Sequence, residues 1–150
     1  MQKWTKPAQS PVRIALLVFD AFSNLCLANC LEPLRAANTL VRREAFDWRI
    51  VTMKGAPALS SSGLQVLPDA ALAQMGRVDY LFVLSGYDHR RHDTPATRRA
   101  LRAAVAGAGT VVGLDAGPWL LASAGLLAGR RRMETTGLSV AEIALRSGYD

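Results

Sequence analysis

Apolar and polar positions alternate along this chain in two different periods, which predicts strands interleaved with helices. Four segments have the apolar or alternating pattern of strands: residues 13–19, 46–53, 79–84 and 110–114. Three have the pattern of helices: residues 27–41, a segment that opens at Thr94–Pro95, and residues 117–127, which are apolar nearly all round. A short ribbon over 58–68 and a short helix over 69–74 complete the pattern. Strands that alternate with helices predict an α/β fold with a parallel sheet.

The carboxyl ends of the predicted strands are the places to look for a binding site. In open parallel sheets, ligands bind beyond those ends, at a topological switch point. The segments that follow three of the strands are Asp20–Phe22, Ser85–Asp88 and Asp115–Gly117. We therefore expect ligand contacts from these segments.

The strongest local signal is the junction of a strand with a buried helix at Asp115. Ala116 and Gly117 are small enough to permit a sharp turn there. A turn of this kind is the nucleophile elbow, which lifts one side chain over the sheet beside the backbone N–H groups of the helix start. The sequence predicts that the lifted side chain is that of Asp115.

The run from Thr110 to Leu127 resembles the DJ-1/PfpI superfamily, which is related to class I glutamine amidotransferases. In that family the elbow residue is a cysteine followed by Ala-Gly or Thr-Gly, and Leu-Leu-Ala and Gly-Leu-Leu recur in the helix. The resemblance implies a flavodoxin-like parallel sheet sandwiched by helices. Regulators that contain this domain continue with further strands after the elbow helix, and this sequence has no counterpart to them. We therefore predict that the fold is C-terminally incomplete.

Two parts of the family's catalytic machinery are absent from the sequence. The elbow residue is Asp115, and a carboxylate is a poor nucleophile for acyl transfer. The family's glutamate after the first strand has no counterpart, since the matching stretch Phe22–Cys26 contains no acid. His89 and His92 are interpreted as surface loop residues. We therefore predict no catalytic residues and no enzymatic activity.

A narrower resemblance comes from Glu32–Asn38, the Asp115 elbow and Ala124–Gly129. Together these segments are similar to the sensor half of AraC-family regulators of the GlxA type, over residues 13–130. Relatives of that type respond to arginine, glycine betaine or carnitine. The resemblance implies a small-molecule sensor for a cationic or zwitterionic amine.

The expected ligand contacts follow from the chemistry of such an amine. Asp115 would pair with the cationic group, and the amides of Ala116 and Gly117 would receive a carboxylate. Two alternatives stay open: Asp115 as a helix N-cap and Trp119 as a core residue. An aromatic wall and a further acid complete the predicted site, namely Trp119, Tyr87, Phe22 and Asp20.

The tail from Gly137 resembles the first helix and turn of an AraC-type DNA-binding domain. Ser139 and Glu142 form a capping box, and the motif continues through Arg146 to Tyr149. Candidate DNA contacts are therefore Ser139, Arg146 and Tyr149. The chain stops where the recognition helix would begin, so we predict that DNA is a partner of the full-length regulator and not of this chain alone.

These resemblances divide the chain into a leader (1–12), a partial sensor domain (13–130) and a linker with a helix-turn-helix fragment (131–150). Strands missing after the sensor domain would leave a sheet edge open, which favours a homodimer. Two other readings remain: a DJ-1/PfpI-type hydrolase or amidotransferase, and a non-functional truncated remnant.

Composition adds a basic balance and few other constraints. The chain of 150 residues has a formal net charge of +6, which is compatible with nucleic-acid binding but also with an arginine-rich solvated surface.

Cys26 and Cys30, four residues apart, are expected to be reduced thiols. We expect no metal and no cofactor. The apolar run at 14–19 is too short to span a membrane and no signal peptide is found, so we expect no membrane partner and a cytoplasmic protein.

Overall fold

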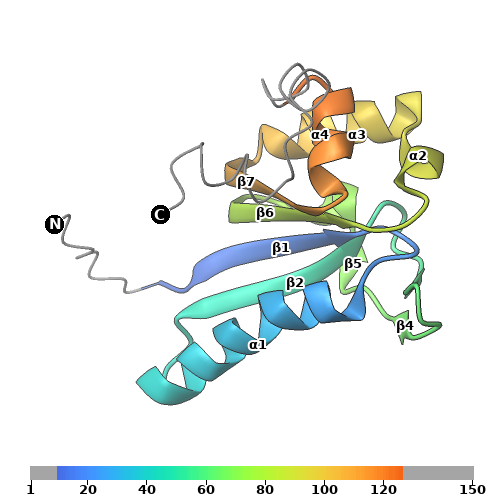
Figure 1. Cartoon of the computed structure of the whole chain (residues 1–150). Coiled ribbons are helices and arrows are strands. Elements are labelled where there is room, and N and C mark those ends of the chain that lie inside the picture. The colour runs from blue at the N-terminus through green and yellow to red at the C-terminus, as the bar shows by residue number, and fades with distance from the viewer. Residues whose placement is uncertain (1–9, 127–150) are drawn as a thin grey trace, which may run out of the picture.

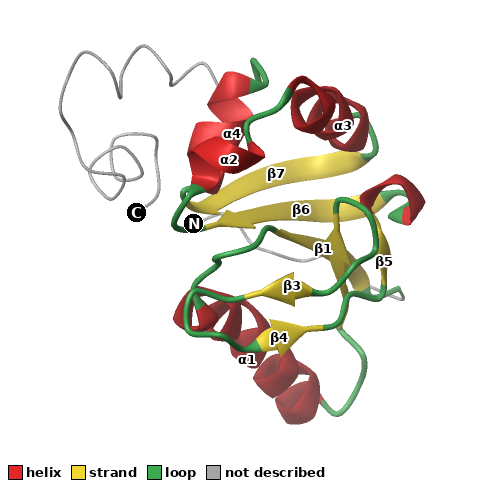
Figure 2. Cartoon of the chain, turned by 90° about the vertical axis from the view of Figure 1, so that its right-hand side faces the viewer, coloured by secondary structure: helices red, strands yellow, loops and turns green. Residues whose placement is uncertain are grey.

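The computed structural model describes residues 10–126 and contains a five-stranded parallel sheet in the order β5-β2-β1-β6-β7. Its strands are β1 (Val12–Val18), β2 (Phe46–Thr52), β5 (Ala70–Ala71), β6 (Val78–Ser85) and β7 (Ala108–Asp115). A separate antiparallel ribbon joins β3 (Ala58–Leu59) to β4 (Gln65–Val66). Figure 2 shows this ribbon beside the sheet.

Helices cover both faces of the sheet, as Figure 1 shows. On one face lies α1 (Asn24–Val41); on the other lie α3 (Pro95–Val105) and α4 (Gly117–Ser123), with the one-turn helix α2 (His89–His92) beside α4. Two apolar clusters follow from this layering. Alternate residues of β1 enter them: Ile14 and Leu16 face α1, whereas Ala15 and Leu17 face the other helices. The predicted α/β sandwich is confirmed.

Local signals in the sequence position the helix starts. Ser23 caps α1 by accepting a hydrogen bond from the Cys26 amide at 3.3 Å, and Thr94 caps α3 by accepting from Thr97 at 3.1 Å. The Asn38 side chain then ties α1 to β2. Its amide donates to the Phe46 carbonyl at 2.8 Å, and its oxygen accepts from the Phe46 amide at 2.9 Å.

The segment 69–74 differs from its prediction. We expected a short helix, but Ala70 and Ala71 pair with β2 as strand β5, and only Leu72–Gln74 form a single 3-10 turn, η1. The Asp69 carboxylate accepts the Ile50 amide at 2.7 Å, and the Asp69 amide donates to the Ile50 carbonyl. These contacts with β2 draw the segment into the sheet. The local periodicity of the segment predicts a helix because it contains no information about pairing with β2.

Strand β7 forms one edge of the sheet within residues 10–126. The elbow helix α4 ends at Ser123, earlier than the predicted 127. Residues 1–9 of the predicted leader lie outside the described residues, and Val12, its last residue, begins β1. The helix-turn-helix fragment and its residues Ser139, Arg146 and Tyr149 also lie outside the described residues. In the part of the chain that is described, no helix combines the length and the apolar character that a bilayer span requires.

Candidate functional site

The turn between β7 and α4 has the geometry of an elbow. Asp115 is the last residue of β7 and has a left-handed backbone with φ of 54°, a strained conformation for a residue that is not glycine. It lies opposite Ser85 of β6 in the register, and the next amide, of Ala116, donates to the Ser85 carbonyl at 2.8 Å. The helix α4 begins at Gly117, the residue after Ala116. The chain therefore reverses its course within two residues.

Two glycines make this reversal possible. A Cβ atom on Gly117 would lie 1.9 Å from the Val83 carbonyl oxygen, and one on Gly113 would lie 2.7 Å from the Pro118 nitrogen. Real Cβ atoms do not approach so closely. The first turn of α4 is thus pressed against both β6 and β7, and Asp115 is held at the carboxyl edge of the sheet.

The Asp115 carboxylate is exposed and has no hydrogen-bond or ion-pair partner among residues 10–126. The N-cap of α4 is Ala116, and no side chain caps that helix. The interpretation of Asp115 as a helix N-cap is therefore wrong. An exposed carboxylate without an internal partner remains available to a cation.

The Ala116 amide is not available in the same way. Because it donates to Ser85, it offers no hydrogen to a bound carboxylate, contrary to the expectation for Ala116. Gly117 is buried, and its role in the structure is the close packing against Val83.

Two thiols lie near the elbow at the start of α1. Cys26 and Cys30 are free and half-buried, and their side chains hydrogen bond to each other. Burial, and secondarily the charge of Asp115, raises the pKa of Cys26 above its ordinary value. Burial together with Cys26 raises the pKa of Cys30 to about 11. The two thiols are therefore protonated at neutral pH, which disfavours a nucleophilic role.

Two histidines pack on aromatic rings beside the same edge. The His89 ring lies 5.2 Å from that of Trp119, and the His92 ring lies 5.1 Å from that of Phe19. His92 Nε2 also lies 3.1 Å from the carbonyl oxygen of Asp20. Both histidines are half-buried. They are packing residues at the candidate site, not the surface loop residues that we expected.

The remaining predicted contacts are dispersed. Phe22 is fully buried in the cluster that faces α1, so it offers no aromatic surface to a ligand. The Asp20 carboxylate accepts the Leu59 amide at 2.9 Å and thereby holds the ribbon. Tyr87 is 77% exposed and projects from the loop after β6. Trp119 is half-buried against His89.

Sequence reasoning named Ser85 and His89 but did not foresee that each has a buried polar atom at the carboxyl ends of the strands. Ser85 Oγ and His89 Nε2 are inaccessible and have no hydrogen-bond partner in the described part of the chain. Ser85 is fully buried and is the register neighbour of Asp115. A serine at the end of an otherwise apolar strand was the available signal for Ser85. Unsatisfied buried polar atoms are uncommon and often mark functional regions.

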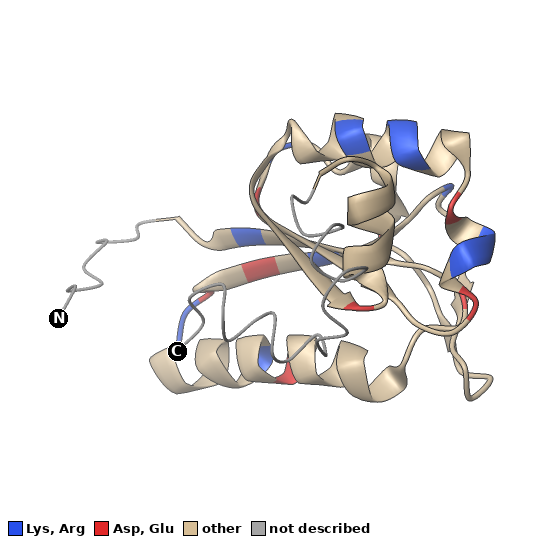
Figure 3. Ribbon diagram, turned by 45° about the horizontal axis from the view of Figure 1, so that its top comes forward, with Lys and Arg blue, Asp and Glu red and all other residues tan. Residues whose placement is uncertain are grey.

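Within residues 10–126, the charged groups form neither a metal-binding cluster nor a single basic face. In the described part of the chain, no group of three or more His, Cys, Asp or Glu side chains is placed to hold a metal ion. Figure 3 shows that the lysine and arginine positions of this part are spread over α1, α2, α3 and the strands. This distribution fits a solvated arginine-rich surface better than a nucleic-acid footprint.

Comparisons with known proteins agree with this geometry. The DJ-1/PfpI family matches residues 12–148. The chain is 37% identical to the HTH-type transcriptional regulator CdhR of Pseudomonas aeruginosa over 115 residues, which cover 77% of this chain and 34% of that protein. It is 32% identical to the HTH-type transcriptional regulator GlxA of Rhizobium meliloti, covering 79% of this chain and 37% of that protein.

A solved structure supports the same relationship. The AraC family transcriptional regulator from Pseudomonas putida superposes with a TM-score of 0.63 at 27% identity, over 78% of this chain and 63% of that one. The chain thus spans about a third of the length of the curated regulators that it matches. It belongs to the DJ-1/PfpI family and is related to the sensor domains of AraC-family regulators of the CdhR and GlxA kind.

Proposed function

We propose that this chain is the effector-sensing domain of a transcription regulator and that Asp115 binds the cationic group of an amine such as arginine, glycine betaine or carnitine. The observation that carries the proposal is the exposed carboxylate on a strained elbow, which has no partner among residues 10–126. Strained backbone conformations persist where the surrounding structure enforces them, and they cluster at functional sites. Gly113 and Gly117 supply that enforcement here.

Two aromatic residues on the elements that meet at the elbow would suit a quaternary or primary amine. Trp119 lies on the first turn of α4, and the exposed Tyr87 follows β6, whose carboxyl end is next to that of β7. Aromatic faces attract ammonium groups, and a carboxylate adds charge pairing. A site of this kind recognises the cationic end of a zwitterion.

The comparisons support the regulator half of the proposal. CdhR and GlxA are named as HTH-type transcriptional regulators, so the partners that we propose for the full protein are a small-molecule effector and DNA. The DNA contacts would come from the region of Ser139, Arg146 and Tyr149, outside the described residues. We also propose a homodimer and a cytoplasmic location, with no enzymatic activity.

The test is a thermal melt of the full chain with each amine. A ligand that binds only the folded state raises the melting temperature. At a ligand concentration of a hundred times its Kd, it adds about 2.7 kcal/mol to the free energy of unfolding. One amine is expected to shift the midpoint of the native chain, and Asp115→Asn is expected to abolish the shift. Glu32→Gln is the matched control, since Glu32 is exposed on α1 and pairs there with Arg35.

The competing enzyme hypothesis predicts a different result. A hydrolase would show turnover that survives Asp115→Asn and disappears in Cys26→Ala, because Cys26 is the thiol whose pKa the charge of Asp115 raises. Unshifted melts with every amine, together with such turnover, would overturn the sensor proposal.

A further inference from the structure

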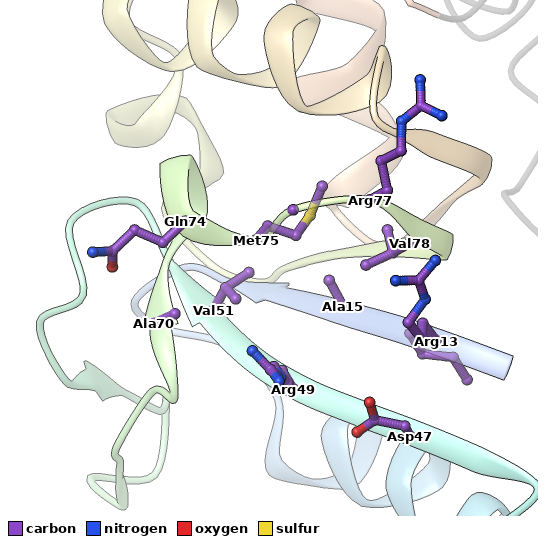
Figure 4. A pocket seen from close by; sticks show the side chains of 12 residues that line it. Arg13, Ala15, Asp47, Arg49, Val51, Ala70, Gln74, Met75, Arg77 and Val78 are labelled. Carbon is purple, nitrogen blue, oxygen red and sulfur yellow. The ribbon is translucent and has the colours of Figure 1, made fainter. Parts of the chain in front are cut away.

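A pocket lies on the α3/α4 face of the sheet, away from the elbow. It has a volume of about 140 Å³ and is formed by the amino-terminal part of β1, by β2 and by the η1–β6 connection. Helices α3 and α4 pack over β6 and β7 and leave β2 uncovered at this point. Figure 4 shows the pocket with its lining side chains. Nothing in the proposed sensor function uses it.

The bottom and walls of this pocket are apolar. Ala15 and Val51 lie at the bottom with at most 1% of their surface exposed. Ala70, Met75 and Val78 are half-buried and form the walls. The volume is close to that of a roughly 150 Å³ engineered cavity that takes up benzene. A body the size of one flat ring therefore fits.

The rim of the pocket is basic. Arg13, Arg49 and Arg77 line it, and none of their guanidinium groups forms an ion pair with another described residue. Arg13 and Arg49 rise from neighbouring strands on the pocket side of the sheet, whereas Arg77 extends outward from the edge, as Figure 4 shows. Asp47 is the one acid in the lining; it lies opposite Arg13 in the register without pairing with it.

We propose that this pocket binds a small carboxylate with a flat apolar body, of which benzoate is the simplest example. A guanidinium group presents a planar set of donors that matches a carboxylate. Unpaired guanidinium groups beside an apolar hollow favour a ligand that is anionic at one end and apolar at the other. Arg49 and Arg13 would contact the carboxylate, and Met75 and Val78 would contact the ring.

The proposal is independent of the elbow site. The pocket lies toward the amino ends of β1 and β6, whereas Asp115 is at the carboxyl end of β7. The two sites also have opposite charge preferences. The same chain would therefore accept an amine at the carboxyl ends of the strands and a carboxylate toward their amino ends.

Titration calorimetry of the full chain with benzoate tests this assignment. Arg49→Gln is expected to weaken binding about three- to fivefold, which is the range of a solvent-exposed ion pair. Asp47→Asn is expected to strengthen it, since it removes the one negative charge in the lining. Arg35→Gln, an equal charge change on α1, and Asp115→Asn are expected to leave it unchanged. Each arginine is exposed, so the melting temperature is expected to stay near that of the native chain.

Two neutral or compact probes separate the alternatives. Benzamide has the ring without the charge, and inorganic phosphate has the charge without the ring. Benzoate binding that exceeds both by about tenfold supports the proposal. Equal binding of benzoate and phosphate would reduce the pocket to general attraction of anions, and equal binding of benzoate and benzamide would remove the role of the arginines. Either result, or the absence of benzoate binding, overturns the proposal.

Discussion

At the scale of single residues, the main feature of Asp115 is the lack of a partner for its carboxylate in the described part of the chain. Its neighbours along the chain are fixed by hydrogen bonding and close packing, yet its carboxylate has no partner within residues 10–126. Among the described residues, Cys26 is the thiol whose pKa the charge of Asp115 raises. The same thiol therefore serves as a reporter of Asp115.

Alkylation of the two cysteines can be used to read this coupling. Because the thiolate is the reactive form and the pKa of Cys30 is about 11, we expect labelling by iodoacetamide in the folded chain to rise steeply between pH 8 and 11. Asp115→Asn removes a negative charge that raises the pKa of Cys26, so Cys26 is expected to react faster at a given pH. Mass spectrometry of the labelled peptides, compared with those of Glu32→Gln, provides the measurement. Equal rates in both variants would contradict the proximity of Asp115.

At the scale of elements, the β7–α4 turn is the feature on which the candidate site depends. Its sharpness comes from contact between the backbone of α4 and those of β6 and β7, with Gly117 and Gly113 at the points of contact. Family resemblance and local composition both indicated an elbow here. The structure adds the reason that glycine is needed at these two positions.

Gly117→Ala is expected to destabilise the chain by about 2 kcal/mol or more, because the new methyl group has no room beside the Val83 carbonyl. Gly63→Ala is the control. Gly63 has a φ of 87° and open space around it, so alanine there meets only backbone strain of about 1–2 kcal/mol. Urea unfolding of both variants measures the difference. A Gly117→Ala variant as stable as the native chain would show that α4 does not pack as described.

At the scale of the whole molecule, the sheet has one long strand at its edge. Strand β7 has eight residues and no outer neighbour within the described part of the chain, and unpaired strand edges promote association with another chain. This observation supports the proposed homodimer without showing one. The predicted division into leader, sensor and helix-turn-helix fragment remains a proposal.

We expect the chain to self-associate through β7. Thr110 is exposed on that strand, and Thr110→Lys places a charge at the edge, a common device against pairing. The variant is expected to weaken the dimer about tenfold in analytical ultracentrifugation, whereas Thr39→Lys on the exposed surface of α1 is expected to have no effect. A native chain that stays monomeric at high concentration would refute the interface.

The sequence by itself determined the alternation of strands and helices, the helix start at Thr94 and the position of the elbow. These features depend on periodicity and on turn chemistry between near neighbours, which are local properties of the chain. The carboxyl ends of the strands were also correctly identified as the edge that carries Asp115.

Only the tertiary structure decided which groups are free to act. Phe22 became core and the Ala116 amide was taken by Ser85, because both outcomes depend on pairing between distant strands. Asn38, Asp69 and Asp20 proved to be links between elements for the same reason. The basic pocket shows this most clearly: Arg13, Arg49 and Arg77 are scattered in the sequence, and strand order and register alone bring them to one hollow. Such contacts are set by which strands lie side by side, and no local pattern encodes that.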